Sequence, residues 1–248
     1  MPRSISDHIM LLAAGLGTRL RPLTLTVPKP LVTLGDGTLL DYHLGHIKAA
    51  GFSKAIINTH YLAPQIVTHL EKQACLPYAL SHEEILLGSG GGIGQALHHF
   101  DGPFFVVNSD TYTPNNLSTV YAQMRTFFDA EKMDVLLLLT PLDNIRGYEG
   151  VGDFLCRDKD GMLTLRGDLP SAPYVYLGIQ ILKPELFKNR EGVFSIFPLW
   201  QKAQQEGRFF GLIHKDFTWF DMGNPHGLSF ARDNITLDQV PCSLFSNS

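Results

Sequence analysis

This sequence of 248 residues lacks several features that would assign it to a class of protein at once. It has only three cysteines, Cys75, Cys156 and Cys242, and no C-x-x-C pair, which disfavours a disulfide framework or a zinc site and favours a reducing compartment. It has no apolar run of the ~18 residues that a membrane span needs, and its start is too interrupted for a secretory signal. We therefore expect a cytoplasmic protein without a membrane partner.

The chain also lacks an excess of positive charge. Its formal net charge is -4, which argues against a nucleic-acid partner held on a broad basic face. A nucleotide ligand is still compatible with this balance, because one triphosphate needs only a few local cations. Apolar residues make up 44% and charged residues 18%, so a disordered or fibrous chain is disfavoured and a globular one is expected.

Familiar catalytic and phosphate-binding motifs are missing as well. A G-x-G-x-x-G fingerprint that starts at Gly15 would need glycine at position 20, where the chain has Leu20, and no G-x-x-x-x-G-K-[ST] occurs. No G-x-S-x-G elbow is present, which disfavours acyl transfer. The ten histidines include no H-E-x-x-H pair, so we expect them to be solvated or at the edge of the core.

What the chain does have is an alternation of short apolar runs with segments of helical periodicity. We expect buried strands at residues 9–13, 55–58, 104–108 and 135–140, and helices at 39–50, 63–70, 93–99 and 117–128. Beyond residue 150 we expect antiparallel strands within 151–182, a short helix from Pro184, a helix at 196–205, strands at 209–213 and 218–220, and a last helix from Pro225.

This order of elements predicts a single-domain, Rossmann-like α/β fold. Strands buried on both faces and joined through helices form a mostly parallel sheet flanked by helices, and the later strands are antiparallel additions to it. We expect one domain over residues 1–237 and a loosely ordered C-terminal tail over residues 238–248. No linker and no internal repeat divides the chain further.

The strongest chemical signal is the stretch after the first strand. Residues 12–24 read LAAGLGTRLRPLT, and residues 28–31 read PKPL. Small residues at the end of the strand let a planar base and ribose lie against the backbone, and the two glycines permit a tight loop whose amides can point at phosphate oxygens. Arg19 and Lys29 add positive charge, and each unit charge ~4 Å from a phosphate contributes about 4 kcal/mol at an effective dielectric near 20.

The full stretch closely resembles the signature of the sugar-1-phosphate nucleotidyltransferase family. Members of that family are α/β enzymes that bind a nucleoside triphosphate over this loop. The resemblance implies that Lys29 neutralises charge at the reacting phosphorus. It assigns the following residues to the nucleotide: Ala13, Ala14, Gly15, Gly17, Thr18, Arg19 and Lys29.

A second glycine-rich stretch, GSGGGI, occupies residues 88–93. By itself, such a glycine run is better explained by a flexible turn. In the family, a glycine-rich stretch at this place contacts the base through main-chain groups. The resemblance therefore implies that Gly90 and Gly91 contact the nucleotide.

Two aspartates, Asp110 and Asp221, each follow a predicted strand. A carboxylate at the carboxyl end of a parallel strand lies where open α/β sheets bind ligands, and Mg²⁺ takes one or two protein carboxylates together with phosphates and water. Either aspartate alone is also explained as a turn cap. The resemblance, through N-S-D at residues 108–110 and W-F-D-M-G at 219–223, assigns both to one Mg²⁺.

The resemblance also assigns Asn108, Asp153 and Gly178 to the sugar phosphate. Many members carry a Glu-Lys-Pro tripeptide whose lysine binds that phosphate, and it is missing here. Lys159 lies in an Asp-Lys-Asp-Gly turn, which favours solvent exposure for it. This compact form, with G-G-G-I, N-x-D and G-D-F, is most similar to the members that are N-acetylmuramate 1-phosphate uridylyltransferases, which serve peptidoglycan recycling.

The resemblance thus implies Mg²⁺-dependent transfer of a nucleotidyl group from a nucleoside triphosphate, UTP by the nearest likeness, to a sugar 1-phosphate, with release of pyrophosphate. Arg19, Lys29 and Asp110 are the expected catalytic residues, and the chain is expected to be a monomer or a small homo-oligomer. Two alternatives stay open. One is a guanylyltransferase for mannose or heptose 1-phosphate, and the other is a catalytically silent sugar-nucleotide sensor of the same fold.

Overall fold

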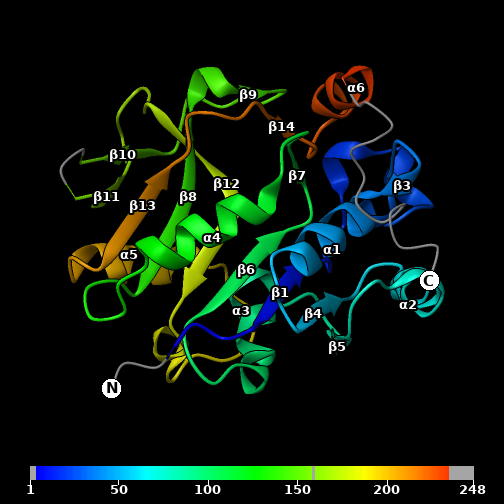
Figure 1. Cartoon of the computed structure of the whole chain (residues 1–248), viewed down its shortest axis with the longest axis horizontal. Helices are drawn as coiled ribbons and strands as arrows, with labels where there is room; N and C mark the ends of the chain where they lie inside the picture. Colours follow the sequence, from blue (N-terminus) through cyan, green and yellow to red (C-terminus); the bar gives the residue numbers. More distant parts are fainter. Residues whose placement is uncertain (1–3, 158–159, 235–248) are drawn as a thin grey trace.

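The computed structural model describes residues 4–157 and 160–234. A nine-stranded sheet runs through the molecule, and helices cover both of its faces (Figure 1). Strands β5, β4, β1 and β6 lie side by side in this order and are parallel. The strands of the sheet are β1 (His8–Leu12), β4 (Lys54–Thr59), β5 (Tyr78–His82), β6 (Phe104–Asn108), β8 (Val135–Pro141), β10 (Phe154–Cys156), β11 (Leu163–Leu165), β12 (Tyr174–Leu182) and β13 (Phe209–Ile213).

The other half of the sheet is mixed. Strand β12 runs antiparallel between β6 and β8, β13 is parallel to β8, and the β10–β11 hairpin joins the start of β12. The expected α/β fold, with a parallel core and antiparallel additions, is therefore confirmed. The helices are α1 (Leu39–Ala49), α2 (Ala63–Gln73), α3 (Gly88–Gln95), α4 (Leu117–Phe127), α5 (Phe197–Gln205) and α6 (Pro225–Asp233), and short 3-10 turns span Thr18–Leu20, Leu23–Leu25, Lys29–Leu31, Leu97–His99, Leu142–Asn144 and Pro184–Phe187.

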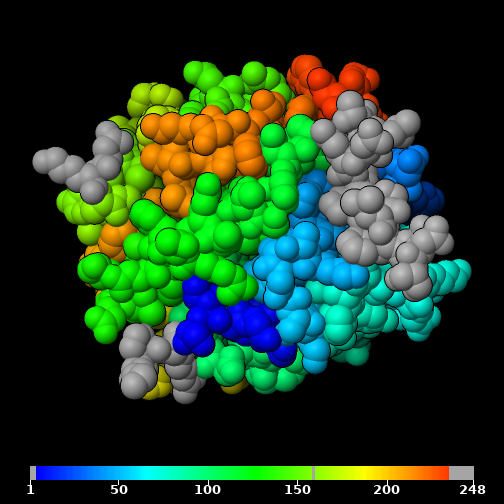
Figure 2. Space-filling view, viewed as in Figure 1, coloured from blue at the N-terminus to red at the C-terminus, as the bar shows by residue number. Residues whose placement is uncertain are grey.

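Alternate residues of the central strands pack into two separate cores. In β1, Ile9 and Leu11 point toward α1, α2 and α4, and Met10 points toward α3 and α5. This follows from the two-residue period of a strand, and it explains why a strand buried on both faces is apolar throughout. Figure 2 shows the side chains of α1 and α4 closing the first of these faces.

Two small sheets stand beside the main one. Strands β2 (Thr33–Leu34) and β3 (Gly37–Thr38) form a hairpin that leads into α1. Strand β14 (Trp219–Asp221) lies between β7 (Thr111–Tyr112) and β9 (Ile145–Arg146), antiparallel to β7 and parallel to β9. The second sheet joins the chain just after β6 to a segment near its end.

The predicted helix over residues 93–99 is wrong in its bounds. Helix α3 begins at Gly88 and contains the whole glycine run, because glycines let the helix lie directly against the segment around Phe194. A 3-10 turn over Leu97–His99 follows it. Strand β5 was not expected from the sequence, and the predicted tail at 238–248 lies outside the described residues.

The expectation for the histidines also needs correction on α1. His43 is fully buried and His46 is 6% exposed, so both belong to the core. Burial, with a smaller effect of His46, lowers the pKa of His43 to about 3, so this imidazole is neutral at physiological pH. Within residues 4–157 and 160–234, no helix combines the length and apolar character that crossing a membrane requires.

Candidate active site

The carboxyl ends of β1, β4 and β6 meet at a cavity of about 280 Å³. This is the edge at which open parallel sheets bind ligands. The cavity is lined by Leu12, Ala14, Gly15, Lys29, Pro30, Asn58, Glu83, Leu86, Gly88, Ser89, Asn108, Ser109 and Asp110. The predicted nucleotide loop and the predicted metal carboxylate that follows β6, Asp110, therefore share one cavity.

The first glycine turn has a backbone that requires glycine at one position. Gly17 has φ 61°, and a Cβ there would lie 2.9 Å from the Thr24 Cγ2. The Thr24 hydroxyl donates a 2.7 Å hydrogen bond to the Gly17 carbonyl and holds the turn closed. The chain then enters the 3-10 turn that begins at Thr18, and this turn carries Arg19.

A buried hydrogen-bond network, which no sequence motif marks, holds this turn in place. The Ala13 N–H donates to the Asn58 Oδ1 (2.8 Å), the Asn58 Nδ2 donates to the Glu83 Oε1 (2.7 Å), and the Leu87 N–H donates to the Glu83 Oε2 (2.8 Å). Asn58 is 4% and Glu83 is 1% exposed. A Cβ at Gly92 would lie 2.4 Å from the Glu83 Oε1, so glycine there leaves room for the carboxylate.

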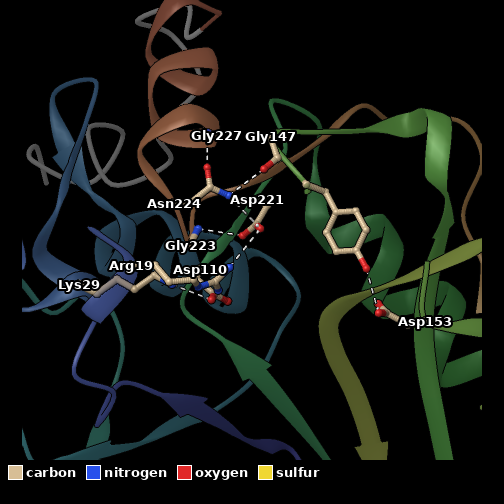
Figure 3. Close-up of polar contacts among 10 residues, drawn as sticks. Arg19, Lys29, Asp110, Gly147, Asp153, Asp221, Gly223, Asn224 and Gly227 are labelled. Atoms are coloured by element: carbon tan, nitrogen blue, oxygen red, sulfur yellow. Dashed lines mark hydrogen bonds and ion pairs between the residues drawn. The ribbon is translucent and has the colours of Figure 1, made fainter. Parts of the chain in front are cut away.

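Pairing of β7 with β14 brings the two predicted metal ligands together. Asp221 lies opposite Thr111, the residue after Asp110, and the Met222 N–H donates a 2.9 Å hydrogen bond to the Asp110 carbonyl. Figure 3 shows the Asp110 and Asp221 side chains next to each other, with Arg19 and Lys29 beside them. Three of these residues were predicted as catalytic and two as metal ligands, and the structure gathers all four.

Lys29 is the main partner of Asp110. The Lys29 Nζ lies 2.7 Å from the Asp110 Oδ2, and the two side chains are 13% and 26% exposed. Burial alone would raise the pKa of Asp110, but the Lys29 ammonium, helped by the charge of Arg19, outweighs it and holds this pKa below its ordinary value. Asp110 is therefore an ionised carboxylate at neutral pH.

Asp221 has a different set of partners. Its Oδ1 accepts the Gly223 N–H (2.8 Å), and its Oδ2 accepts the Asn224 Nδ2 (3.3 Å) and lies 3.7 Å from the Arg19 Nη1. Asn224 also caps α6 by accepting the Gly227 N–H at 2.9 Å. Burial first, and then the charge of Asp110, raise the pKa of Asp221 against the opposing hydrogen bond from Gly223.

These two carboxylates fit a divalent cation. The charge of Asp110 adds to the larger effect of burial in raising the pKa of Asp221, and a cation held by both carboxylates would relieve their repulsion. No group of three or more His, Cys, Asp or Glu side chains in the described part of the chain could hold a metal. Mg²⁺ needs no such cage, because it binds through one or two carboxylates and takes its other oxygens from phosphates and water.

Gly178 and Asn108, both predicted to contact the sugar phosphate, also lie together. Gly178 has φ 73° and lies in β12 where its pairing with β8 shifts register. A Cβ at Gly178 would lie 2.9 Å from the Asn108 Cβ and 2.9 Å from the Thr111 Oγ1. The bulge therefore places the β12 backbone directly against the end of β6.

Asp153 lies apart from this group. Its Oδ1 accepts a 2.9 Å hydrogen bond from the Tyr148 hydroxyl, and its Oδ2 accepts the Tyr176 N–H at 3.2 Å. Figure 3 shows Asp153 set away from the pair formed by Asp110 and Asp221. It lines a second cavity rather than the first.

The amides of Gly90 and Gly91 are used inside the protein. Both N–H groups donate to the Phe194 carbonyl, at 3.0 and 3.1 Å, and the neighbouring Gly88 and Ser89 line the first cavity instead. The role of Gly90 and Gly91 in nucleotide binding stays a prediction, whereas their close packing already explains why both are glycine. Lys159 lies outside the described residues.

In sequence and in fold, the chain is similar to known nucleotidyltransferases. The family model described as nucleotidyl transferase matches residues 8–155. The N-acetylmuramate alpha-1-phosphate uridylyltransferase of Caulobacter vibrioides is 35% identical over 223 residues, which are 87% of this chain and 91% of that protein. Its namesake in Neisseria meningitidis serogroup B is 30% identical over 227 residues, which are 86% and 92%. The structure of HddC from Yersinia pseudotuberculosis has the same fold, with a TM-score of 0.74, 22% identity, and coverage of 92% of this chain and 99% of that one.

Proposed function

Because this chain belongs to the nucleotidyl transferase family, we propose that it transfers a uridylyl group from UTP to N-acetylmuramate 1-phosphate, in the presence of Mg²⁺. The products are the UDP-activated sugar and pyrophosphate. Membership of the family and both relatives support sugar-1-phosphate nucleotidyl transfer in general. The choice of UTP and N-acetylmuramate 1-phosphate, and with it a role in peptidoglycan recycling, is supported by the names of the relatives from Caulobacter and Neisseria.

The observation that carries the proposal is the meeting of Asp110 and Asp221 beside Arg19 and Lys29. Two anionic substrates must approach each other in this reaction, so catalysis depends on position and on neutralised charge. A cavity lined by Gly15, Lys29 and Asp110, with Arg19 and Asp221 beside that lysine and aspartate, supplies both. The same arrangement disfavours a silent sensor, because such a protein has no need of both carboxylates.

The reaction we propose is an in-line displacement. A phosphate oxygen of the sugar 1-phosphate forms a bond to the α-phosphorus of UTP, while the bond from that phosphorus to the departing pyrophosphate oxygen breaks. The attacking oxygen is already anionic at neutral pH, so no general base is required. Arg19 and Lys29 neutralise the phosphate oxygens, the turn at Gly15 and Gly17 holds the triphosphate, and Asn108 orients the sugar phosphate.

Asp110 and Asp221 are the residues that would hold Mg²⁺. The ion, when bound, supplies Lewis-acid neutralisation of the phosphate oxygens around the reacting phosphorus. Lys29 keeps the Asp110 carboxylate ionised and oriented toward the cavity, as its 2.7 Å contact and the lowered pKa of Asp110 indicate. The backbone amide of Gly223 does the same for one oxygen of Asp221.

A release assay for pyrophosphate tests the proposal. The purified protein is incubated with Mg²⁺, each of the four ribonucleoside triphosphates and, in turn, the 1-phosphates of N-acetylmuramate, N-acetylglucosamine, mannose and heptose. We expect the largest kcat/KM with UTP and N-acetylmuramate 1-phosphate. A preference for GTP with mannose or heptose 1-phosphate would instead make the chain a guanylyltransferase, and no release with any pair would support the silent sensor.

A further inference from the structure

A second cavity, of about 480 Å³, lies on the far side of Asp153. Four aromatic side chains form much of its wall, with a few polar groups among them, which is the composition typical of small-molecule sites. Its lining residues are Asp153, Phe154, Leu165, Arg166, Gly167, Tyr176, Phe197, Trp200 and Gln201. None of the roles described above uses this aromatic wall.

The second cavity lies close to the reaction centre. Tyr176 in its wall and Gly178 beside Asn108 are two residues apart on β12, so at most about 7 Å of backbone separates them. The Tyr176 N–H donates to the Asp153 carboxylate, which therefore lies at the same end of β12. A sugar whose phosphate lies at Asn108 would extend along β12 toward this cavity.

Arg166 brings a positive charge to the cavity. It lies directly opposite Asp153 across the β10–β11 hairpin, and its N–H donates a 2.9 Å hydrogen bond to the Asp153 carbonyl. Residues opposite each other in an antiparallel pair place their side chains on the same face. The Arg166 guanidinium donates to the Leu169 carbonyl, and no carboxylate of residues 4–157 or 160–234 lies within ion-pair distance of it.

The guanidinium of Arg166 thus differs from those of Arg157 and Arg208. Arg157 pairs with Asp160 in the same hairpin, and Arg208 pairs with Asp134. An arginine has five N–H donors in a planar fork that matches a carboxylate, so Arg166 retains donors for a ligand after its one contact with Leu169. Asp153 accepts hydrogen bonds from Tyr148 and Tyr176 and makes no ion pair with Arg166.

We propose that this cavity is the subsite for an acidic substituent of the sugar, and that Arg166 binds the carboxylate of that substituent. The inference rests on the proposed function and deepens it. N-acetylmuramate differs from N-acetylglucosamine by an ether-linked lactate, and the lactate carboxylate is such a group. Arg166 therefore determines which of these two sugars the protein prefers, and it takes no part in the chemical step.

A comparison of two sugar substrates tests this role. We expect Arg166→Gln to raise the KM for N-acetylmuramate 1-phosphate about 10- to 100-fold, the range of one lost charge-assisted hydrogen bond, with kcat nearly unchanged. The KM for N-acetylglucosamine 1-phosphate should stay as in the wild type, and Arg166→Lys should retain part of the selectivity. Arg157→Gln, in the same hairpin, is the matched control and should behave as the wild type. An equal change for both sugars, or no change, would overturn the proposal.

A binding measurement separates this inference from the proposed function. Trp200 lines the cavity and the second tryptophan, Trp219, is fully buried, so Trp200 fluorescence can report on ligands there. We expect free N-acetylmuramic acid to change this fluorescence at lower concentration than N-acetylglucosamine does, and Arg166→Gln to remove the difference. The titration needs neither nucleotide nor turnover. If the wild type binds both sugars equally, or neither of them, the assignment of Arg166 is overturned even where the transfer reaction proceeds.

Discussion

The main-chain N–H of Met222 donates a 2.9 Å hydrogen bond to the main-chain carbonyl of Asp110. This bond continues the pairing of β7 with β14, in which Asp221 lies opposite Thr111. Two carboxylates that are far apart in the sequence are thereby held on neighbouring backbone segments. The proposed metal site thus depends on a three-stranded sheet outside the main one.

Loss of either carboxylate should stop the reaction without unfolding the protein. For Asp110→Asn and Asp221→Asn we expect kcat to fall by at least ~100-fold, as when a single group that stabilises transition-state charge is removed. Asp216→Asn, an exposed aspartate on the segment before β14, is the matched control and should retain full activity. Pyrophosphate release measures the rate, and circular dichroism measures the fold. Near-normal Mg²⁺-dependent turnover in either variant would refute its assignment as a metal ligand.

The raised pKa of Asp221 predicts that its ionised carboxylate lowers the free energy of unfolding at neutral pH. Burial, and then the charge of Asp110, raise its pKa in the folded protein. A carboxyl with a raised folded-state pKa contributes stability below its unfolded pKa, near ~3.9, and this contribution is lost as the pH rises through the folded value. Asp221→Asn should therefore increase the free energy of unfolding in urea at pH 7, by an amount that shrinks as the pH falls toward ~3.

The ionised carboxylate of Asp110 should have the opposite effect and raise the free energy of unfolding at neutral pH. Lys29 and Arg19 lower its pKa against the effect of burial, so its charged form stabilises the folded state. That contribution is present above the unfolded pKa and is lost as the pH falls through the folded value. Asp110→Asn should therefore lower the free energy of unfolding at pH 7 and lose this effect on acidification. If both variants shifted stability in the same direction, the charge arrangement described here would be wrong.

The bulge at Gly178 predicts a selective defect in sugar binding. Gly178→Ala strains a residue at φ 73° and also places a Cβ 2.9 Å from the Asn108 Cβ. Gly207→Ala is the matched control, because Gly207 has φ 66° but nothing within 4 Å of the added Cβ. Each variant should lose about 1–2 kcal/mol from its backbone conformation. Only Gly178→Ala should also raise the KM for the sugar 1-phosphate, measured at saturating UTP. A comparable rise in Gly207→Ala would remove the case for Gly178.

The buried hydrogen-bond network through Asn58 should support both stability and nucleotide binding. Asn58→Ala leaves the Ala13 N–H and the Glu83 Oε1 without their 2.8 and 2.7 Å partners in a buried place. Each orphaned group costs about 1–3 kcal/mol, and displacement of the first turn should raise the KM for UTP. Asn234→Ala, which removes one exposed amide hydrogen bond, should do neither. Urea unfolding and initial rates measure the two effects, and an unchanged KM would mean that Asn58 only stabilises the fold.

Sequence patterns predicted the elements that have a strong local signal in the sequence. Strands β1, β4, β6 and β8 each contain a continuous apolar run because both of their faces are buried, and this signal needs no tertiary information. Strand β5 was not predicted because its sequence, YALSH, is short and partly polar, as suits a strand at the edge of the sheet. Helix α3 was misplaced because glycine lowers helix propensity, and only the contact with the segment around Phe194 explains why a glycine run is helical.

The residues of the site likewise fall into those that a sequence motif marks and those that only the structure reveals. The first glycine turn, Lys29 and the two aspartates carry motifs, so their residues could be named from the sequence, although their convergence depends on the pairing of β7 with β14. Asn58 lies at the carboxyl end of β4, one residue before its last, and a polar residue at that place in a buried strand is a signal for a functional role. Glu83 gave no such signal, because it follows the strand that was missed. Arg166 has no motif around it, and only its place opposite Asp153 in the structure indicates a role in binding.

The position of the metal ion shows whether Asp110 and Asp221 bind it together. Crystals grown with UTP and Mn²⁺ in place of Mg²⁺ can be measured at the manganese absorption edge, where anomalous scattering locates the ion. We predict a peak about 2 Å from a carboxylate oxygen of Asp110 and of Asp221, with the triphosphate lying across the turn at Gly15 and Gly17. A manganese peak that touches neither aspartate, with the triphosphate bound away from that turn, would contradict the account.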